Sequence, residues 1–355
     1  MVFCYKAQGE FMAKRRRSTR KDVAERAGVS VAVVSYVVNA GSRPVAPSTR
    51  AKVEKAIEEL GYYPNEIARG LVLQQSSTIG LITPDYTNPV YGEEAEAIQE
   101  VCLPNGYLML FVYSGNSTDR ERELVLMFRA KQVDGVIIQP VSSDPVETIK
   151  PLKQAGIPVV LIQYDCCDVP CVVLADVRGG QLATQHLLDL GHRRIGLIKG
   201  RLPGAARAEE RLIGYRQALQ AAGVEYDPAL VITSDVTQEA GYQAMQQLLV
   251  LPKPPTSVFC HNDVLAVGAM HAIRTAGLSI PGDISVVGFD DTTGSAHLVP
   301  PLTTIRFSRR EMGRQAAAIL FRTIEQNGNN QPYTIELPVE LIVRESTGPW
   351  KEHHS

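Results

Sequence analysis

Long apolar stretches are missing from this chain of 355 residues, and no run approaches the roughly 18–20 apolar residues that a membrane-spanning helix needs. The N-terminal segment MVFCYKAQGEFMAKRRRSTR has no apolar core followed by small residues, and its charges come last, so it lacks the form of a secretory signal. These absences argue against an integral membrane protein and against a secreted one. We therefore expect a cytoplasmic protein with no membrane partner.

Paired cysteine motifs are missing as well. The six cysteines are Cys4, Cys102, Cys166, Cys167, Cys171 and Cys260, and none has the spacing of a zinc site or of a thioredoxin-like motif. We interpret them as reduced thiols. The group Cys166, Cys167 and Cys171 leaves open a redox or metal-sensing role.

The usual signatures of enzymes are also missing. The chain has no G-x-S-x-G nucleophile elbow, no P-loop and no paired metal-ligand motif. Isolated carboxylates and His261 are the remaining candidates for catalysis. We therefore expect a protein that is not an enzyme and that holds no cofactor and no metal.

Positive charge is concentrated near the N-terminus. Residues 14–69 contain twelve Lys and Arg against six Asp and Glu, whereas the rest of the chain contains 24 against 32. A basic segment joined to an acidic body is expected when one part binds phosphate and the other does not. This asymmetry indicates that the N-terminal segment binds nucleic acid.

The same N-terminal segment has the pattern of a helix-turn-helix. Thr19 can cap a first helix through its hydroxyl, and that helix runs to about Ala27. Gly28 supplies a short turn, and Ser30 caps a second helix that ends near Asn39. In a helix-turn-helix, the second helix enters the DNA major groove.

A third helix, about Pro47 to Leu60, closes the small core of this segment. A helical bundle without a DNA role would show the same periodicity. The local excess of positive charge favours the DNA-binding alternative.

From residue 78 onward, short apolar runs alternate with helical stretches. The runs at 79–83, 107–113, 135–140 and 158–163 are typical of buried parallel strands, with helices near 91–104, 119–132 and 144–155 between them. A second series has runs at 194–200, 230–233, 257–262 and 285–290, and helices near 179–190, 205–222, 237–250 and 263–276. The tail adds runs at 302–307 and 333–344 with a helix between them.

Two successive series of this kind predict an α/β fold with two doubly wound parallel-sheet subdomains. The late elements can cross back and join the two halves. Ligands of open α/β sheets bind beyond the carboxyl ends of the strands, so two facing sheets form a cleft. Polar side chains follow several of these strands, as a small polar ligand would require. They are Asp85, Asn88, Tyr91, Arg211, Asn262, Asp263, Asp290 and Asp291.

Three N-terminal motifs carry a resemblance to a known family. They are DVAERAGVS (22–30), VSYVVN (34–39) and LGYYPNEIARGL (60–71), and they resemble the N-terminal signature of the LacI/GalR family of bacterial transcription regulators. RLIGY (211–215), HNDVLAVG (261–268) and VVGFDD (286–291) extend the resemblance, which covers about 18–348. It implies an all-α helix-turn-helix domain joined to a sensor core like the periplasmic sugar-binding proteins.

The resemblance assigns DNA contacts by position. Val31, Ala32 and Tyr36 are implied to read bases in the major groove. Thr19, Ser30, Ser35, Asn39 and Arg50 are implied to contact the backbone. The chain departs from the common pattern because the position of Tyr36 is often Arg, so no bidentate pairing names a base. For Ser35, a hydroxyl bonded back into its own helix is an equal alternative.

The segment after the third helix matches the hinge helix of the family. Asn65, Ala68, Arg69 and Leu71 are implied to lie in the minor groove, with Leu71 wedged between base pairs. Gly70 weakens a free helix here by roughly 1 kcal/mol relative to Ala, which fits folding on DNA. Ordinary helix packing is the alternative for Leu71.

The family match also implies effector contacts at Arg211, Asn262 and Asp290, and we add Asp85, Asn88 and Tyr91 from the strand ends. Asp263 and Asp291 are expected to cap the helices that follow them. His261 is expected to be a packed histidine. The aromatic residue that would contact a sugar ring stays open among Tyr86, Tyr91, Tyr164 and Tyr215.

These expectations define a domain plan. A flexible basic tail (1–17) precedes the helix-turn-helix domain (18–63), a hinge and linker (64–77), an effector-binding core (78–348) and a tail (349–355). Within the core, 78–175 with 307–335 forms one subdomain. The other consists of 176–303 with 336–348.

The expected function is a DNA-binding transcription regulator and, by family habit, a repressor. We expect it to bind double-stranded pseudo-palindromic operator DNA as a homodimer. A dimer is favoured over a tetramer because no leucine heptads, which would form a tetramerising coiled coil, follow Trp350. A carbohydrate is the expected effector. The alternatives are a purine or nucleoside acting as corepressor, or a sugar-binding protein that does not bind DNA. The sign of the effector response and the operator sequence stay open.

Overall fold

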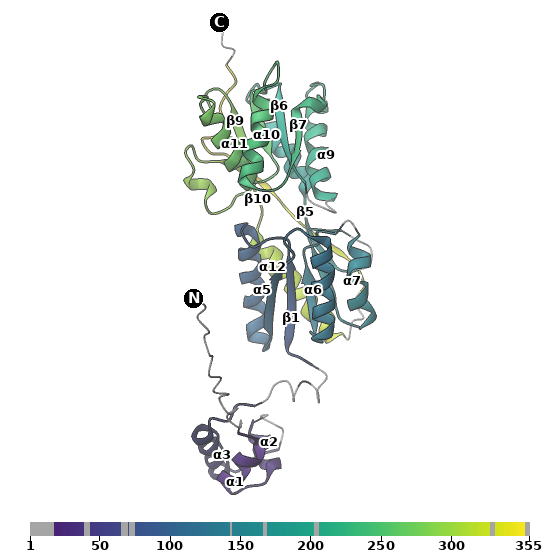
Figure 1. Cartoon of the computed structure of the whole chain (residues 1–355), viewed down its shortest axis with the longest axis vertical. Helices are drawn as coiled ribbons and strands as arrows, with labels where there is room; N and C mark the ends of the chain where they lie inside the picture. Colours follow the sequence, from purple (N-terminus) through teal and green to yellow (C-terminus); the bar gives the residue numbers. More distant parts are fainter. Residues whose placement is uncertain are drawn as a thin grey trace, which may run out of the picture. The chain divides into compact units, whose positions relative to one another are not determined.

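The computed structural model describes residues 18–38, 43–64, 70, 75–142, 144–165, 169–201, 206–326 and 331–351. The chain divides into two units, Met1–Gln74 and Gln75–Ser355, each with a hydrophobic core of its own (Figure 1). Asn39 and the hinge candidates Asn65, Ala68, Arg69 and Leu71 lie outside the described residues, as do Cys4, Cys166 and Cys167.

The smaller unit is a bundle of three helices, α1 (Arg20–Ala27), α2 (Val31–Val38) and α3 (Pro47–Leu60). The predicted helices are confirmed to within a residue or two. Thr19 forms a capping box with Asp22, which satisfies backbone N–H groups at the start of α1. Gly28 ends α1 at a φ of 65°, a left-handed conformation that favours glycine and keeps the turn before α2 short.

The core of this bundle is small and apolar. Its buried residues are Val23, Ala24, Val34, Val37, Val53, Ala56 and Tyr62. They come from all three helices and from Tyr62, which lies two residues after the end of α3. Burying these faces holds α2 against α1 and α3 and leaves the opposite side of α2 exposed.

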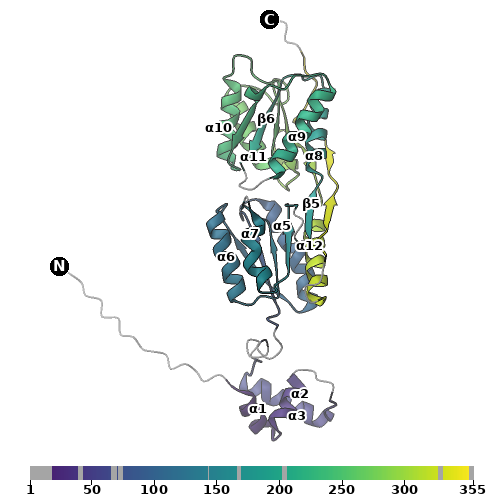
Figure 2. The ribbon, with the colours of Figure 1, turned by 90° about the vertical axis from the view of Figure 1, so that its right-hand side faces the viewer.

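The larger unit contains two lobes, each built on a six-stranded sheet with helices on both faces (Figures 1 and 2). The sheet of the first lobe has the strand order β11-β5-β4-β3-β1-β2, and all its pairs are parallel. Its strands are β1 (Thr78–Thr83), β2 (Leu108–Tyr113), β3 (Gly135–Ile138), β4 (Val159–Ile162), β5 (Cys171–Leu174) and β11 (Thr334–Leu337). Helices α5 (Pro89–Cys102) and α12 (Arg309–Glu325) pack together on one face, and α6 (Thr118–Ala130) and α7 (Pro145–Gln154) pack on the other.

The sheet of the second lobe has the order β12-β10-β9-β8-β6-β7, in which only β12 is antiparallel to its neighbour among the described pairs. Its strands are β6 (Ile195–Gly200), β7 (Val231–Ser234), β8 (Ser257–Cys260), β9 (Ser285–Asp290), β10 (Thr303–Arg306) and β12 (Glu340–Ile342). The pair α8 (Asp176–Asp189) and α9 (Ala206–Ala221) packs on one face, and the pair α10 (Gln238–Leu249) and α11 (Asp263–Thr275) packs on the other. The prediction of two doubly wound parallel-sheet lobes is therefore confirmed.

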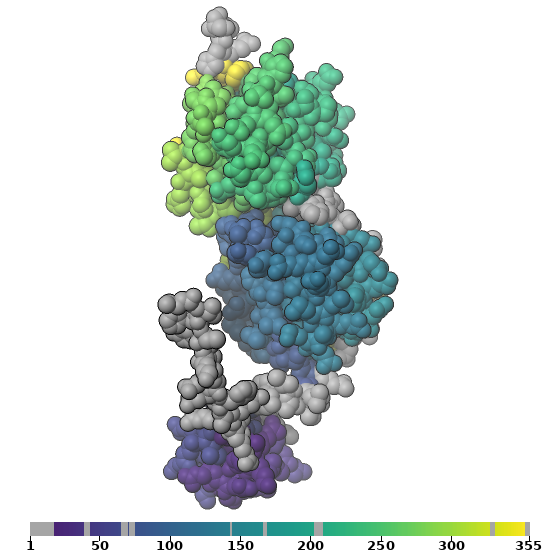
Figure 3. Space-filling view, in the orientation of Figure 1, coloured from purple at the N-terminus to yellow at the C-terminus, as the bar shows by residue number. Residues whose placement is uncertain are grey.

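The chain passes between the lobes three times, after β5, after β10 and between β11 and β12 (Figure 2). The first lobe therefore contains a helix, α12, and a strand, β11, that come from the end of the sequence. Figure 3 shows the two lobes in contact in a space-filling view. The carboxyl ends of parallel strands in both sheets border the region between the lobes.

Three details of the predicted strands are wrong. The run 333–344 is not one strand, because β11 joins the first sheet and β12 joins the second. Strand β5 was not predicted. Strand β2 is not buried but forms the edge of its sheet, with Leu108 60% exposed. In the part of the chain that the structure describes, no helix is both long and apolar enough to cross a membrane.

Candidate functional site

Arg211 lies on α9 and is held in place by contacts of its buried side chain. Its Nε donates to Asp176 Oδ1 at 2.8 Å, and its Nη1 donates to the carbonyl oxygen of His261. The guanidinium carbon lies 3.5 Å from the centroid of the Phe289 ring. These contacts join α8, α9, β9 and the end of β8, so the position of the arginine is set by the fold of the second lobe.

A glycine permits this arrangement. A Cβ atom built on Gly180 of α8 would lie 2.3 Å from the carbonyl oxygen of Arg211, a distance that a real Cβ does not tolerate. Glycine at this position therefore lets α8 and α9 approach closely. The close approach brings Asp176, at the start of α8, to the guanidinium of Arg211.

Asp290 ends β9 in an unusual environment. Its side chain is buried, and its backbone has a φ of 109°, which is rare for a residue with a side chain. Burial raises the pKa of this carboxyl to about 8, with Asp263 and Asp176 acting in the same direction and Arg211 and Arg309 acting against it. A carboxyl with this pKa can be protonated near neutral pH and can then donate a hydrogen bond as well as accept one.

Tyr91 on α5 connects the first lobe electrostatically to this group. The pKa of its phenol is raised above the ordinary value, first by burial and then by the negative charges of Glu94, Asp290 and Asp85, while Arg211 lowers it. The interaction of two charges weakens as the distance between them grows. Asp85 of the first lobe and Arg211 and Asp290 of the second lobe all influence the phenol of Tyr91.

The remaining predicted effector residues make local contacts. Asn88 caps α5, because its Oδ1 accepts from the Val90 N–H at 3.1 Å. Asn262 caps α11 in the same way through the Leu265 N–H at 3.1 Å. Asp85 accepts from the N–H groups of Tyr86 and Thr87 at 2.6 and 2.9 Å. The other carboxylate oxygen of Asp85 accepts from the Thr87 hydroxyl at 2.7 Å, so both of its oxygens have local partners. An effector role stays a prediction for Asn88, Asn262 and Asp85.

Two neighbouring carboxylates do not have the predicted role. Asp263 and Asp291 were expected to be helix caps, and this is wrong. Asp263 accepts from Thr292, Ser295 and Thr304 and thereby fastens the loop after β9. Asp291 accepts from Arg306 and from Arg344, both at 2.6 Å. His261 is buried, as expected for a packed histidine.

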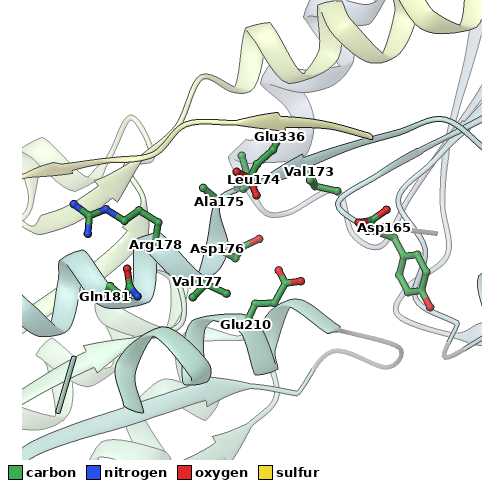
Figure 4. Close-up of a pocket in the computed structure, with 11 residues that line it drawn as sticks. Asp165, Val173, Leu174, Ala175, Asp176, Val177, Arg178, Gln181, Glu210 and Glu336 are labelled. Carbon is green, nitrogen blue, oxygen red and sulfur yellow. The ribbon is translucent and has the colours of Figure 1, made fainter. Parts of the chain in front are cut away.

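A separate pocket of about 330 Å³ lies where the chain first passes between the lobes (Figure 4). It is lined by Tyr164, Asp165, Val173, Leu174, Ala175, Asp176, Val177, Arg178, Gln181, Glu210 and Glu336. None of the six predicted effector residues lines it, although Asp176 belongs to it and also pairs with Arg211. In the described part of the chain, no group of three or more His, Cys, Asp or Glu side chains is placed to hold a metal ion.

The predicted base readers lie on α2 of the smaller unit. Val31 is 46% exposed, Ala32 is exposed and Tyr36 is half-buried. Ser30 caps α2 through the Val33 N–H at 3.4 Å. The exposed side of the helix is therefore mainly apolar, and it offers van der Waals contact to base edges rather than bidentate hydrogen bonds.

Arg43, which was not singled out in the sequence, lies beside Tyr36. Its Nη1 donates to the tyrosine hydroxyl at 3.4 Å, and its guanidinium carbon lies 5.7 Å from the ring centroid. Among the proposed backbone contacts, the Thr19 hydroxyl donates to Asp22 at 2.7 Å, Arg50 approaches Glu54 at 3.7 Å and Ser35 is half-buried.

Comparison with known proteins places both units in one family. Residues 19–65 match the family model described as bacterial regulatory proteins, lacI family, and residues 184–347 match a periplasmic binding protein-like domain. The HTH-type transcriptional regulator DegA of Bacillus subtilis (strain 168) is 36% identical over 338 residues, which are 94% of this chain and 99% of the relative. The chain belongs to the LacI family. The resemblance inferred from the N-terminal motifs is thereby confirmed.

Other members of the LacI family agree with this assignment. The HTH-type transcriptional repressor PurR of Vibrio atlanticus (strain LGP32) is 33% identical over 92% of this chain and 98% of its own. A structure of the Lac repressor dimer bound to operator and the anti-inducer ONPF matches with a TM-score of 0.83 and 31% identity over 94% of this chain and all of that one. A complex of the transcriptional regulator CelR with cellobiose matches with a TM-score of 0.70 and 33% identity over 93% and 100%.

Membership in the LacI family establishes a DNA-binding transcription regulator and not an enzyme.

Sequence reasoning missed two polar groups at strand ends of the core. Gln139 follows β3 and Ser234 ends β7, and in the described residues the buried atoms Gln139 Oε1 and Ser234 Oγ have no hydrogen-bond partner. Gln139 and Ser234 come at the end of an apolar run, which is the same signal that identified Asp85 and Asn262. The sequence therefore contained the signal needed to find them.

Proposed function

We propose that this LacI-family regulator is a repressor that binds a pseudo-palindromic operator as a homodimer and responds to a small polar effector between its two lobes. The effector that we propose is a carbohydrate. Two copies of the smaller unit related by a two-fold axis would match the two halves of such an operator. Effector and operator then act on each other's affinity by the same factor.

The observation that carries the effector proposal is that Asp290 and Arg211 of the second lobe influence the pKa of Tyr91 in the first lobe. A ligand that bridges these groups would favour one arrangement of the lobes over others, which is the requirement for a ligand to shift an equilibrium. Gln139 and Ser234 add hydrogen-bonding groups whose buried atoms find no partner among the described residues. We assign both to the effector site.

The chemistry of these groups favours a polyhydroxylated ligand. A carboxyl, an amide and a hydroxyl can each accept or donate, and sugar hydroxyls do both. The related regulator in complex with cellobiose supports the same choice. A purine or nucleoside is the second candidate, and it is favoured by the similarity to the repressors named PurR.

For the operator, we propose that Val31, Ala32 and Tyr36 contact base edges and that Thr19, Ser30, Ser35 and Arg50 contact the backbone. We assign the same backbone role to Asn39 and a minor-groove role to Asn65, Ala68, Arg69 and Leu71. The exposed apolar start of α2 supports contact with thymine methyl groups. Arg43 supplies the guanidinium that α2 itself lacks.

The test has two parts on the full chain. The first selects binders from a library of duplexes with a randomised inverted repeat, and we expect one two-fold sequence to bind far more tightly than random DNA. The second measures thermal shifts with cellobiose, ribose and adenosine and then measures operator affinity with each. One of these should raise the melting temperature and change operator affinity.

Matched variants locate the effector. Asp290→Asn should abolish the thermal shift, whereas Glu336→Gln, in the pocket beside the first crossing, should leave it unchanged. The opposite pattern would move the effector to that pocket. A protein that binds all duplexes equally would contradict the operator proposal.

A further inference from the structure

Arg309 contacts both lobes of the core. It is the first residue of α12, which packs on α5 and on strands of the first lobe. Its Nε donates to Glu93 Oε2 on α5 at 2.8 Å. Its Nη1 donates to the carbonyl oxygens of Asp290 and Asp291, the second at 3.1 Å, and these residues belong to the second lobe. One guanidinium therefore joins a first-lobe carboxylate to two second-lobe carbonyls.

The two carbonyls belong to a strained segment of the chain. Asp290 and Asp291 have φ values of 109° and 50°, both in the region that side chains disfavour. Such a conformation persists only where its surroundings hold it in place. Here Arg309 holds the two carbonyls, while Arg306 and Arg344 hold the carboxylate of Asp291.

Glu93 receives contacts from both lobes as well. Its Oε2 accepts from Arg309, and its Oε1 accepts from Thr293 Oγ1 of the second-lobe loop at 3.4 Å. The Arg309 side chain is 12% exposed, so its hydrogen bonds are shielded from water more than those of a surface ion pair. The pair is therefore built into the boundary between the lobes.

We propose that Glu93 and Arg309 form an interlobe latch, in which Arg309 positions the backbone of Asp290 and links it to α5. The inference rests on the proposed effector role of Asp290. An effector that binds the Asp290 carboxyl must adjust the backbone whose carbonyl oxygens Arg309 holds. That adjustment reaches the first turns of α5 and α12 through the guanidinium and the Glu93 carboxylate.

A neighbouring ion pair provides a matched control. Arg310, the next residue of α12, pairs with Glu96 and Glu100 of α5. It joins the same two helices as Arg309, yet it lies within the first lobe and is 40% exposed. A purely structural role in holding α12 against α5 would be shared by both arginines. Only Arg309 contacts the second lobe in these pairs.

The experiment is hydrogen–deuterium exchange on the full chain without DNA or ligand, in the wild type and the variants Arg309→Met, Glu93→Gln and Arg310→Met. The reporters are backbone amides of the loop after β9. Thr292 N–H donates to Asp263 Oδ2 at 2.9 Å, and Ser295 N–H donates to the carbonyl oxygen of Thr292 at 2.8 Å. Both are protected only while the loop keeps its conformation.

We expect Arg309→Met to speed exchange of these amides about tenfold, the factor that corresponds to losing one charge-assisted hydrogen bond. Glu93 lies in the first lobe, yet Glu93→Gln should speed exchange of the same second-lobe amides about threefold, because the group that orients the guanidinium loses its charge. A double variant that combines Arg309→Met with Glu93→Gln should match Arg309→Met within about twofold, since both changes act on one latch. Arg310→Met should leave the amides unchanged.

Two results would overturn the latch. One is an exchange rate in Arg309→Met no faster than in Arg310→Met. The other is a Glu93→Gln variant with wild-type exchange in the second-lobe loop. If Arg309→Met does not fold, Arg309→Lys takes its place, because a single ammonium group cannot bridge the carboxylate and both carbonyls. The readout uses neither operator nor effector, so failure of the latch is distinguishable from failure of the proposed function.

Discussion

Replacing Asp290 with Asn should stabilise the effector-free protein at neutral pH, although it removes a proposed effector contact. The folded state raises the pKa of this carboxyl to about 8 from an ordinary value of 3.8, mainly because the group is buried. A carboxyl with a raised pKa favours folding below its unfolded pKa, and that contribution is lost as the pH rises through the folded pKa. The cost to the wild type therefore grows from about pH 4 to about pH 8.

The size of the effect follows from the same shift. Over the roughly three pH units between 3.8 and 7, a cost of 1.36 kcal/mol per unit amounts to about 4 kcal/mol as a ceiling. The loop after β9 can relax and admit water when the carboxyl ionises, so we expect a gain of about 1–3 kcal/mol for Asp290→Asn. In a core of this size, that gain corresponds to a rise in melting temperature of about 2–10 °C.

The assay compares thermal and urea unfolding of the wild type and the variant at pH 4.5 and at pH 7.5. All other titrating groups are common to both proteins, so the difference between them reports Asp290 alone. The difference should be small at the lower pH and large at the higher one. A variant that is less stable than the wild type at pH 7.5, or a difference that does not depend on pH, would refute the reasoning.

The neighbouring carboxylate provides the control with the opposite sign. Asp291→Asn removes the negative charge that lies between Arg306 and Arg344, each 2.6 Å away. We expect a loss of about 2 kcal/mol at pH 7.5, the size of a charge-assisted hydrogen bond. Two adjacent aspartates of one loop should thus respond to the same substitution in opposite directions.

Three further predictions concern other parts of the molecule. Burial lowers the pKa of His192, so the unfolded chain binds a proton before the folded protein does as the pH falls below about 6.5. The stability that the protein loses between pH 7.5 and 5.5 should therefore be smaller in His192→Asn. Gly180→Ala should cost about 1–3 kcal/mol in urea unfolding because its Cβ would meet the Arg211 carbonyl, whereas Gly92→Ala on the exposed side of α5 should cost nothing. Val31→Ala should weaken binding to the selected operator by about 1 kcal/mol and leave affinity for random DNA unchanged in a titration of both duplexes.

The helices of the smaller unit were predictable from the sequence because their determinants are local. A capping hydroxyl at Thr19 specifies where α1 begins, and the glycine at position 28 specifies where it ends. A short apolar periodicity indicates α2. The strands of the core were predictable for a similar reason, since continuous apolar runs of four to six residues have few alternatives. Strand β5 (Cys171–Leu174) was the exception and was not predicted.

The pairing of distant segments was not predictable in the same way. Only the tertiary structure separates β11 from β12. The two strands come from one run of the sequence, yet β11 joins the sheet of the first lobe and β12 joins the sheet of the second. The roles of Asp263 and Asp291 were mistaken for the same reason, because their partners Thr304 and Arg344 lie 41 and 53 residues further along the chain. A carboxylate after a strand has the same appearance in the sequence whether it caps a helix or fastens a loop.

The sequence by itself determined the family, the two-lobed α/β core and the identity of most groups at the strand ends, because these depend on residue type, local spacing and periodicity. The tertiary structure alone decided which of these groups meet. The burial that raises the pKa of Asp290, the close approach of α8 and α9 at Gly180, and the contact of Arg309 with both lobes all arise between residues far apart in the chain. Burial and charge interaction depend on distance in space, and that distance is set only when the lobes have folded and packed.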